Sequence, residues 1–185
     1  MYVKENFVEK NLFQNLKDTL FSSNISWYYS PAMVTDSSFN KTTANDSGFW
    51  YHNFYFRGEV LSPFYDTLIK PILDPLKISE LYNVRANCMY NPIGSNRVIS
   101  DWHVDLKDQN ATTGILYMNT CNGMTEIKED KVVGQESVEN TFISFNSMLQ
   151  HRAIGQTNSL RRIVINFNYI DSKDFYTNDL NRLYK

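Results

Sequence analysis

The sequence predicts a mainly β (α+β) domain, a barrel or sandwich of short strands with N-terminal helices packed on one outer face. Two observations predict this fold class. Seven strand-like segments separated by polar turns follow Glu80, and short strands at such close spacing are typical of barrels and sandwiches. Two segments with helical spacing of apolar residues precede them. The length of 185 residues suits one domain that buries its core without disulfides.

Two amphipathic helices are expected in the first third. In residues 5–21 apolar side chains recur every three or four positions, which predicts a helix that lies against a sheet. These side chains are Phe7, Val8, Leu12, Leu16 and Leu20. A second helix is expected over 62–73, where Pro71 should kink or end it because proline removes an amide donor from the helix ladder.

Between these helices we expect a strand, a loop and an aromatic cluster. Residues 25–29 predict a strand closed by Pro31, and residues 32–48, rich in Ser, Thr, Asn and Asp, predict a long surface loop. Such a loop is either a lid or binding segment, or a disordered one. His52 lies within the aromatic run 49–56. We expect it to be a hydrogen-bonded or surface residue, with a substrate contact as the functional alternative.

The strands of the barrel are predicted from short apolar runs between turn signals. Their ranges are 81–90, 98–105, 113–119, 124–128, 131–133, 141–145 and 161–169. Trp102, in the second of these strands, is expected to pack on the outside of the barrel.

Composition excludes several classes of partner and compartment. A net charge of −2 gives no general electrostatic reason to bind nucleic acid or an anionic membrane. Cys88 and Cys121 form neither a disulfide framework nor a CxxC zinc motif. The N-terminus has no apolar leader, and no window approaches the length of a membrane helix. We therefore expect a soluble, unprocessed, cytoplasmic protein.

A metal site is predicted from two of the three histidines. His103 and Asp105 share one face of their strand because side chains at i and i+2 point the same way. His151 follows 46 residues after Asp105, with several strands between them that can carry the chain around a barrel and back. Two imidazoles and one carboxylate leave half of an octahedral Fe(II) shell open for a co-substrate and O2. A metal-dependent oxidation is the chemistry that this set favours.

A cationic partner for a dicarboxylic co-substrate is available in the last strand. A guanidinium suits a carboxylate because its fork pairs both oxygens. By alternation Arg162 shares a face with Val164 and Asn166, while Arg161 lies on the other face. Both faces are apolar enough to be internal, so periodicity alone does not choose between Arg161 and Arg162.

The ligand set and its surroundings resemble the Fe(II)- and 2-oxoglutarate-dependent dioxygenases, most closely their prolyl 4-hydroxylase-like branch. The resemblance covers about residues 81–169, roughly half the chain, and its short motifs occur in the family's order. They are a tyrosine-proline/glycine turn, a Tyr-Leu-Asn-like triplet, a Gly-Gly-Thr-like turn, Phe-x-Ser-x-x-x-His and Arg-x-x-x-Asn-Phe. In this chain they fall on Tyr90-Asn91-Pro92-Ile93-Gly94, Tyr117-Met118-Asn119, Asn122-Gly123-Met124-Thr125-Glu126, Phe145-Asn146-Ser147-Met148-Leu149-Gln150-His151 and Arg162-Ile163-Val164-Ile165-Asn166-Phe167.

The resemblance implies a fold and a ligand set. The fold is a double-stranded β-helix, a cupin-like jelly roll whose mouth holds the iron. His103, Asp105 and His151 would be the catalytic iron ligands. Arg162 would bind the distal carboxylate of 2-oxoglutarate, and is favoured over Arg161 because the family's asparagine falls on Asn166.

The resemblance also implies further co-substrate contacts, at residues that match the family's motifs less directly. Tyr117 would donate its hydroxyl to the same distal carboxylate, and Tyr90 would line the pocket. Asn87 and Asn166 are weaker candidates. In a regular strand Asn87 and Tyr90 point to opposite faces, so a bulge would be needed to bring both inward.

The implied reaction hydroxylates a C–H bond and releases succinate and CO2. It needs Fe(II), 2-oxoglutarate and O2, with ascorbate as a candidate reductant. The substrate would be a small molecule or a peptide, with a prolyl, peptidyl or free amino acid as the candidate; nucleic acid and membrane are not expected as partners. We expect one domain over 1–185, with support and substrate-side elements in 1–79, the jelly roll and metal site in 80–170, and a tail in 171–185.

Two other readings stay open. An oxidative demethylase of nucleic acids or small molecules belongs to the same superfamily. The nucleic-acid enzymes of that type carry a second arginine six residues after the first, and here that position is Asn168. A non-catalytic jelly-roll binding protein is the alternative of a different class, although a pure binding module has no need of an open metal face.

Overall fold

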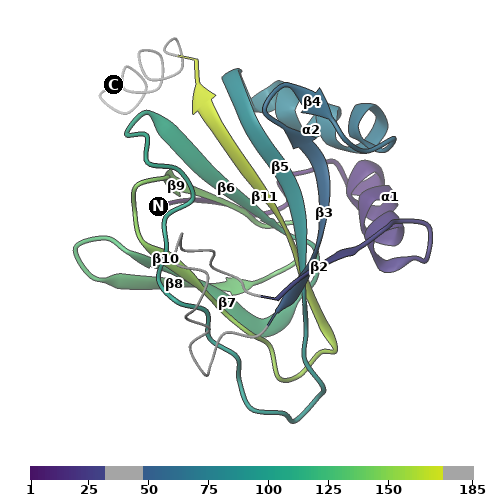
Figure 1. Ribbon diagram of the computed structural model, residues 1–185, viewed down its shortest axis with the longest axis vertical. Helices are drawn as coiled ribbons and strands as arrows, with labels where there is room; N and C mark the ends of the chain where they lie inside the picture. Colours follow the sequence, from purple (N-terminus) through teal and green to yellow (C-terminus); the bar gives the residue numbers. More distant parts are fainter. Residues whose placement is uncertain (32–47, 173–185) are drawn as a thin grey trace.

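The computed structural model describes residues 1–31 and 48–172, which form two facing antiparallel sheets (Figure 1). The larger sheet has eight strands, in the order β1-β9-β6-β11-β5-β3-β2 with β4 paired to β3. Its strands are β1 (Tyr2–Lys4), β2 (Tyr28–Ser30), β3 (Phe49–Phe56), β4 (Glu59–Val60), β5 (Ile78–Tyr90), β6 (Ala111–Tyr117), β9 (Phe142–Asn146) and β11 (Arg161–Asp171). The predicted jelly-roll fold is confirmed.

The smaller sheet closes the other side of the barrel. It consists of β10 (His151–Ile154), β7 (Cys121–Lys128) and β8 (Val132–Ser137), in that order. The segment 98–105 runs beside β10 and touches it through two isolated bridges, Ile99 to Ile154 and His103 to His151. The regular strand expected over 98–105 is therefore wrong, since only these two positions pair.

Strands β5 and β11 form the centre of the larger sheet and separate two environments. Antiparallel pairing matches Arg162 with Met89 and Asn166 with Arg85. Because side chains alternate across a strand, one face of β11 sends Ile163, Ile165 and Phe167 into the main hydrophobic core under the helices. The opposite face sends Val164 into a second core between the sheets, with Ile115, Tyr117, Ile127, Ile143 and Phe145. The polar residues on this inner face therefore lie between the two sheets.

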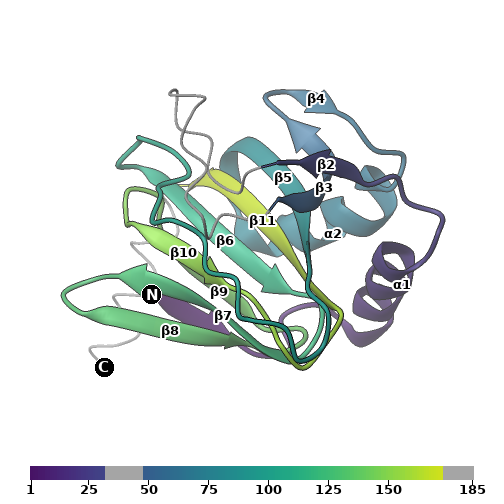
Figure 2. The same ribbon diagram turned by 60° about the horizontal axis from the view of Figure 1, so that its bottom comes forward.

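Helix α1 (Lys10–Phe21) covers the outer face of the larger sheet, as predicted. Figures 1 and 2 show it on the side of β3 and β5 that faces away from the smaller sheet. The helix begins at Lys10 rather than near residue 5, and the side chain of Glu9 caps it by accepting from the amides of Asn11 and Leu12. Residues 2–4 instead form β1 on the edge of β9. The apolar residues Phe7 and Val8 lie between the two elements, and their amides donate to the carbonyl and the Oδ1 of Asn140.

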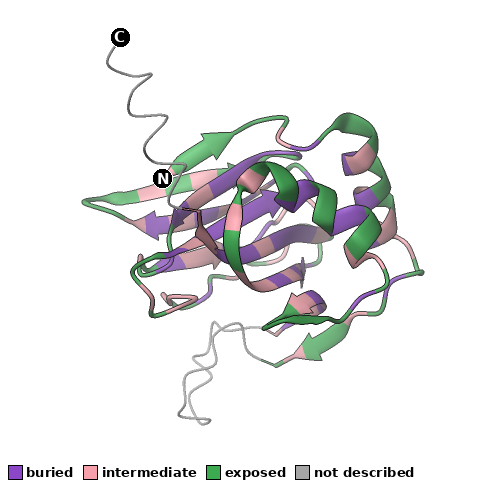
Figure 3. Ribbon diagram, turned by 90° about the horizontal axis from the view of Figure 1, so that it is seen from above, coloured by how far each residue is buried: buried purple, intermediate pink, exposed green. Residues whose placement is uncertain are grey.

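The second predicted helix is broken into turns of different pitch. A wide π-helical turn η1 (Tyr65–Ile69) leads into α2 (Lys70–Leu73) and a tight turn η2 (Asp74–Leu76). Pro71 lies at the start of α2, where a missing amide hydrogen costs little. Instead of the kink predicted at Pro71, the helix changes from π-helical to α-helical pitch between Ile69 and Lys70, just before the proline. Figure 3 shows that the helices bury one side against the sheet and leave the other exposed.

Several other predictions can be compared directly. The aromatic run Phe49–Phe56 is itself a strand, β3, while the strand expected over 25–29 is the short Tyr28–Ser30. The loop predicted for 32–48 and most of the tail predicted for 171–185 lie outside the described residues. No helix in 1–31 or 48–172 is long and apolar enough to cross a membrane.

Candidate functional site

Three side chains predicted as metal ligands converge between the two sheets. One ligand atom from each of His103, Asp105 and His151 lies within 4.8 Å of the others. Oδ1 of Asp105 is 3.5 Å from Nε2 of His151 and 3.9 Å from Nε2 of His103. The three atoms can therefore reach one ion placed among them.

Backbone pairing brings the two histidines together. The amide of His103 donates to the carbonyl of His151 at 3.0 Å, and the amide of His151 returns the bond at 2.9 Å. This reciprocal pair places two side chains 48 residues apart on the same face. Asp105 follows two residues after His103 and points to the same space, although the segment is not a regular strand.

Carbonyl contacts fix the orientation of both imidazole rings. Nδ1 of His103 lies 3.0 Å from the carbonyl of Asp101, and Nδ1 of His151 lies 3.3 Å from the carbonyl of Leu149. A carbonyl only accepts, so in the neutral ring Nδ1 carries the proton and Nε2 keeps its lone pair. Nε2 of His151 is buried and has no hydrogen-bond partner among the described residues. An ion bound beside Asp105 would satisfy this atom.

The Asp105 carboxylate is held from its other side. Its Oδ2 accepts from Nδ2 of Asn168 at 2.9 Å and from Oγ1 of Thr113 at 3.2 Å. Burial alone would raise the pKa of this carboxyl, but the His151 ring and the Asn168 amide hold that pKa well below its usual range. Burial, together with His151, lowers the pKa of His103. An ionised Asp105 and a His103 that resists protonation favour metal binding, because a divalent metal needs a carboxylate and free imidazole nitrogens.

Arg162 is a buried cation on the wall of the same cavity. Its side chain is 2% exposed; Nη2 donates to Oγ1 of Thr125 at 3.0 Å, and Nη1 lies 3.8 Å from Sδ of Met89. Its Nε is buried without an acceptor, and no carboxylate of residues 1–31 or 48–172 lies within 4.0 Å of its guanidinium. An unpaired charge is costly to bury. This position therefore suits an anionic ligand.

Alternation on β11 resolves the choice between the two arginines. Arg162 points to the space between the sheets, whereas Arg161 is on the opposite face with its guanidinium 5.0 Å from the ring centroid of Phe21. Gly123 on β7 makes room for the inward arginine, since a Cβ there would lie 2.6 Å from Cδ of Arg162. The Gly-x-Thr part of the turn motif thus provides both space and a hydrogen-bond acceptor.

The remaining predicted residues divide into those that reach the cavity and those that do not. Asn87 and Asn166 line it, and the Oδ1 atom of each is buried without a hydrogen-bond partner in the described chain. Tyr117 is fully buried next to Arg162, and its hydroxyl donates to the carbonyl of Gln135 at 3.4 Å. Tyr90 is 58% exposed and does not line the cavity, contrary to expectation. The reason is that β5 pairs regularly with β11 through this stretch, so no bulge turns Tyr90 inward.

Two aromatic side chains outside the predicted ligand set, His52 and Trp102, have structural roles. His52 is buried; its Nδ1 lies 2.8 Å from the carbonyl of Ser26 and its Nε2 lies 2.8 Å from Oγ of Ser62. This is the hydrogen-bonded role expected for it. The ring of Trp102 is covered by the cations of Lys128 and Arg152, 4.3 and 4.4 Å from its centroid. It packs outside the metal ligands, as predicted.

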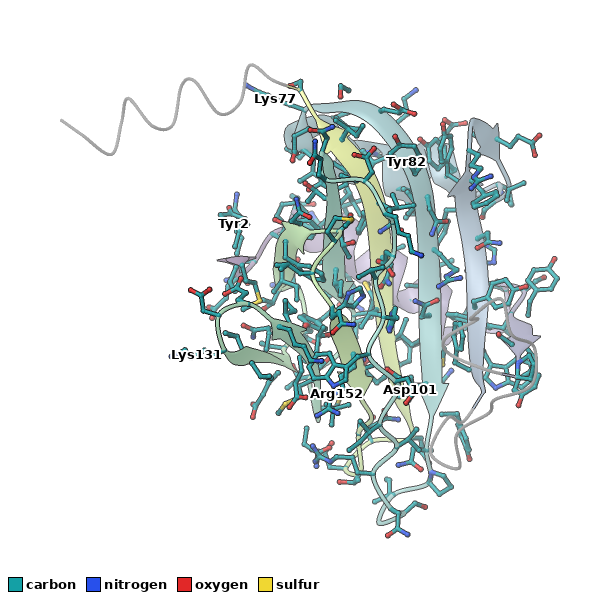
Figure 4. The ribbon with its side chains drawn as sticks, turned by 60° about the vertical axis from the view of Figure 1, so that its left-hand side comes forward. Tyr2, Lys77, Tyr82, Asp101, Lys131 and Arg152 are labelled. Carbon is teal, nitrogen blue, oxygen red and sulfur yellow. The ribbon has the colours of Figure 1, made fainter. Side chains whose placement is uncertain are left out.

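Two cavities meet at this site. The first, of about 70 Å³, lies between the sheets and contains the predicted metal ligands, Asn87 and Arg162. The second, of about 900 Å³, is a groove lined by Tyr55, Arg57 and Tyr82. Among the described residues, only Arg85 and Asp105 line both. Figure 4 shows Tyr82, on the groove, toward the opposite end of the molecule from Arg152, which lines the first cavity.

Sequence reasoning missed three polar residues of this site. They are Arg85, Thr113 and Asn168. Arg85 could have been found from alternation alone, because it precedes Asn87 by two positions on β5 and so shares its face. The contacts of Thr113 and Asn168 with Asp105 depend on the packing of three separate segments and left no local signal.

The sequence matches no protein-family model and no curated protein. Solved structures are similar in fold. A prolyl hydroxylase from Trichoplax adhaerens, in complex with a peptide fragment of the hypoxia inducible factor oxygen degradation domain, is 15% identical with a TM-score of 0.61, over 96% of this chain and 86% of its own.

Two further structures have the same architecture. An oxidoreductase of the 2OG-Fe(II) oxygenase family from Burkholderia pseudomallei is 9% identical with a TM-score of 0.61, over 89% of this chain and 82% of its own. The non-heme alpha ketoglutarate dependent epimerase SnoN from nogalamycin biosynthesis is 10% identical with a TM-score of 0.58, over 91% and 77%. The chain therefore has the double-stranded β-helix fold of the 2-oxoglutarate- and Fe(II)-dependent oxygenases, prolyl hydroxylases included.

Proposed function

We propose that this protein is an Fe(II)- and 2-oxoglutarate-dependent oxygenase that hydroxylates its substrate and releases succinate and CO2. One observation carries the proposal: an open His-Asp-His face and a buried arginine without a carboxylate partner line the same cavity. The first feature suits a metal with vacant positions, and the second suits the distal carboxylate of a dicarboxylic acid.

The metal would be held by Nε2 of His103, Nε2 of His151 and a carboxylate oxygen of Asp105. Fe(II) bound there supplies, with 2-oxoglutarate and O2, the oxidising power to hydroxylate an unactivated C–H bond. The protein's own part is orientation. Asn168 and Thr113 hold Asp105, and the carbonyls beside each histidine keep Nε2 directed toward the ion.

The co-substrate would lie between the metal ligands and Arg162. The Arg162 guanidinium, braced by Thr125, would pair with the distal carboxylate. Asn87 and Asn166 offer polar atoms along the same wall. Tyr117 would donate its hydroxyl to the same carboxylate, since its ring lies against the guanidinium of Arg162 and its hydroxyl interacts with Arg162 and Thr125.

The substrate class is a small molecule or a peptide, and the fold alone does not choose between them. A prolyl, peptidyl or free amino acid is our candidate, supported by the likeness to prolyl hydroxylases. An oxidative nucleic-acid demethylase is less well supported. Position 168, where those enzymes carry a second arginine, is an asparagine that is engaged with Asp105. Cys88 and Cys121 are buried free thiols, which fits a reducing, cytoplasmic location with ascorbate as an available reductant.

The test is spectroscopic and precedes any search for a substrate. Purified protein is mixed anaerobically with Fe(II) and 2-oxoglutarate, and the weak visible charge-transfer band of the chelate is recorded. We expect the band in the wild type and in Arg161→Gln, whose guanidinium faces away from the cavity. Arg162→Gln should need at least about tenfold more 2-oxoglutarate, since a charge-assisted bidentate pair is lost.

Two ligand variants complete the experiment. His103→Ala and Asp105→Ala should show no band and form no succinate in air. A folded wild-type protein without the band would refute the co-substrate assignment. An Arg161→Gln defect larger than that of Arg162→Gln would refute the assigned roles of the two arginines.

A further inference from the structure

A second arginine on the cavity wall has no assigned partner. Arg85 lies on β5, opposite Asn166 of β11 and Asn53 of β3. Its Nε is buried without an acceptor, and within 1–31 and 48–172 no carboxylate lies within 4.0 Å of its guanidinium. The rings of Phe49 and Tyr51 lie 5.5 and 5.9 Å from the guanidinium. They fix its position without neutralising its charge.

The charges around the cavity leave Arg85 unbalanced. Arg152, which also lines the cavity, is paired with Glu126 at 2.7 Å. If the proposed function holds, Fe(II), Asp105, Arg162 and the doubly negative co-substrate together sum to zero. The positive charge of Arg85 then has no counter-charge, although its guanidinium is largely buried. Asp105 attracts it from beyond ion-pair distance, but that carboxylate is already engaged by Asn168 and Thr113.

Arg85 also stands where the two cavities meet. In the part of the chain that the structure describes, only Arg85 and Asp105 line both the first cavity, of about 70 Å³, and the groove of about 900 Å³. A molecule entering through the groove would therefore reach Arg85 next to a proposed metal ligand. Arg162, by contrast, lines the first cavity and not the groove.

We propose that Arg85 binds a carboxylate of the substrate, so that the protein acts on a small free acid that enters through the groove. The inference rests on the proposed function and narrows its substrate class. The arginine would pair with the acid group, and the carbon to be oxidised would lie close to that group because Arg85 neighbours Asp105. A residue in the interior of a peptide has no α-carboxylate to offer at this point, so a peptide without an acidic side chain at the reacting position is disfavoured.

The test uses acetate as the minimal carboxylate and acetamide as its neutral counterpart. The anaerobic protein is loaded with Fe(II) and saturating 2-oxoglutarate, which occupies Arg162. Acetate is then titrated to about 50 mM at constant ionic strength, and the midpoint of thermal unfolding is measured. For a site with a dissociation constant of about 10 mM we expect acetate to raise the midpoint by about 3 °C, and acetamide not to raise it.

Substitutions test whether Arg85 is the residue that causes the shift with acetate. Arg85→Gln should abolish the acetate shift, and Arg85→Lys should keep part of it. Arg161→Gln is the matched control, because it removes a guanidinium from the other face of the neighbouring strand. Arg85→Gln should retain the charge-transfer band at a 2-oxoglutarate concentration within about twofold of the wild type. Without metal or acid it should be at least as thermally stable as the wild type, because an unpaired buried charge is removed.

Each contrary result has a distinct meaning. Equal acetate shifts in wild type and Arg85→Gln, or no shift in a wild type that shows the band, would overturn the proposal; the second result would point to an uncharged or peptide substrate. Loss of the band in Arg85→Gln would assign this arginine to the co-substrate instead. A large loss of stability in Arg85→Gln would assign it a structural role. Absence of the band in the wild type would refute the proposed function itself.

Discussion

The side-chain amide of Asn168 donates a 2.9 Å hydrogen bond to Oδ2 of Asp105, and so turns the other carboxylate oxygen, Oδ1, toward the two histidines. Hydrogen bonds to metal-ligating carboxylates typically contribute tenfold to a hundredfold in metal affinity. We therefore expect Asn168→Ala to weaken Fe(II) binding by about tenfold or more. Competition with a chelator under anaerobic conditions measures this.

Asn168→Asp is the matched comparison for this contact. This substitution keeps the shape of the side chain but replaces the amide donor with a second carboxylate close to Asp105. The affinity for Fe(II) should therefore fall at least as far as in Asn168→Ala. A smaller loss would mean that the new carboxylate itself binds the ion. Unchanged Fe(II) affinity in Asn168→Ala would mean that Thr113, the other donor to Oδ2, suffices to orient Asp105.

Gly123 is required for the position of Arg162. A Cβ at this position would lie 2.6 Å from Cδ of Arg162 and 3.0 Å from the carbonyl oxygen of Ile154. The carbonyl belongs to the paired strand and cannot move easily, so the arginine must shift. Gly123→Ala should therefore raise the 2-oxoglutarate concentration that half-saturates the charge-transfer band by about tenfold, a loss of about 1.4 kcal/mol, while Fe(II) binding stays intact.

Gly134→Ala provides the control on the neighbouring strand β8. A Cβ there would meet only Sδ of Met124 at 3.3 Å and Cγ of Glu126 at 3.9 Å, and the flexible methionine can adjust. We expect its affinity for 2-oxoglutarate to stay within about twofold of the wild type. Equal behaviour of the two variants would show that Arg162 does not depend on the space at Gly123.

The convergence of the three predicted metal ligands could be predicted because its signal is local at each position. An i, i+2 spacing suffices to place His103 and Asp105 on one side of an extended chain, even though the segment pairs only at two bridges. The choice of Arg162 over Arg161 needed a motif in addition to alternation. Asn87 and Tyr90 could both point inward only with a bulge between them. Regular pairing of β5 with β11 turns Asn87 inward and leaves Tyr90 exposed.

The polar residues around the ligands could not be predicted in the same way. Thr113 and Asn168 contact Asp105 from two different strands, β6 and β11, and neither contact follows from local spacing. The start of α1 also depended on tertiary contacts. Both side-chain polar atoms of the buried Asn140 bond to the backbone of Val8, which holds residue 8 outside the helix despite its helical spacing.

The buried His52 ring predicts a loss of stability at acid pH. Burial lowers its pKa from the ordinary value of 6.5, and the hydrogen bond to the carbonyl of Ser26 offsets this only in part. The folded state therefore prefers the neutral ring. Its contribution to stability is present above pH 6.5 and is lost as the pH falls from there toward the lowered pKa, because the unfolded chain takes up the proton first.

Denaturant unfolding of the metal-free protein measures this effect. From about pH 7.5 to about pH 5.5, the free energy of unfolding should fall more steeply in the wild type than in His52→Gln, which cannot be protonated. All other titratable groups are common to both proteins and cancel in the comparison. Equal slopes would show that His52 is as easily protonated in the folded state as in the unfolded chain.

Leu16 tests whether helix α1 supports the fold without touching the site. Its side chain is fully buried in the main core beneath the helix, on the side of the larger sheet that faces away from the metal ligands. Leu16→Ala should lower the free energy of unfolding by about 2–5 kcal/mol through lost burial and the cavity left behind. Asn15→Ala, at an exposed position of the same helix, should change it by less than about 0.5 kcal/mol. Below the unfolding transition both variants should bind Fe(II) and 2-oxoglutarate as the wild type does, and a binding defect in Leu16→Ala would show that the helix helps to position β5 and β11 at the site.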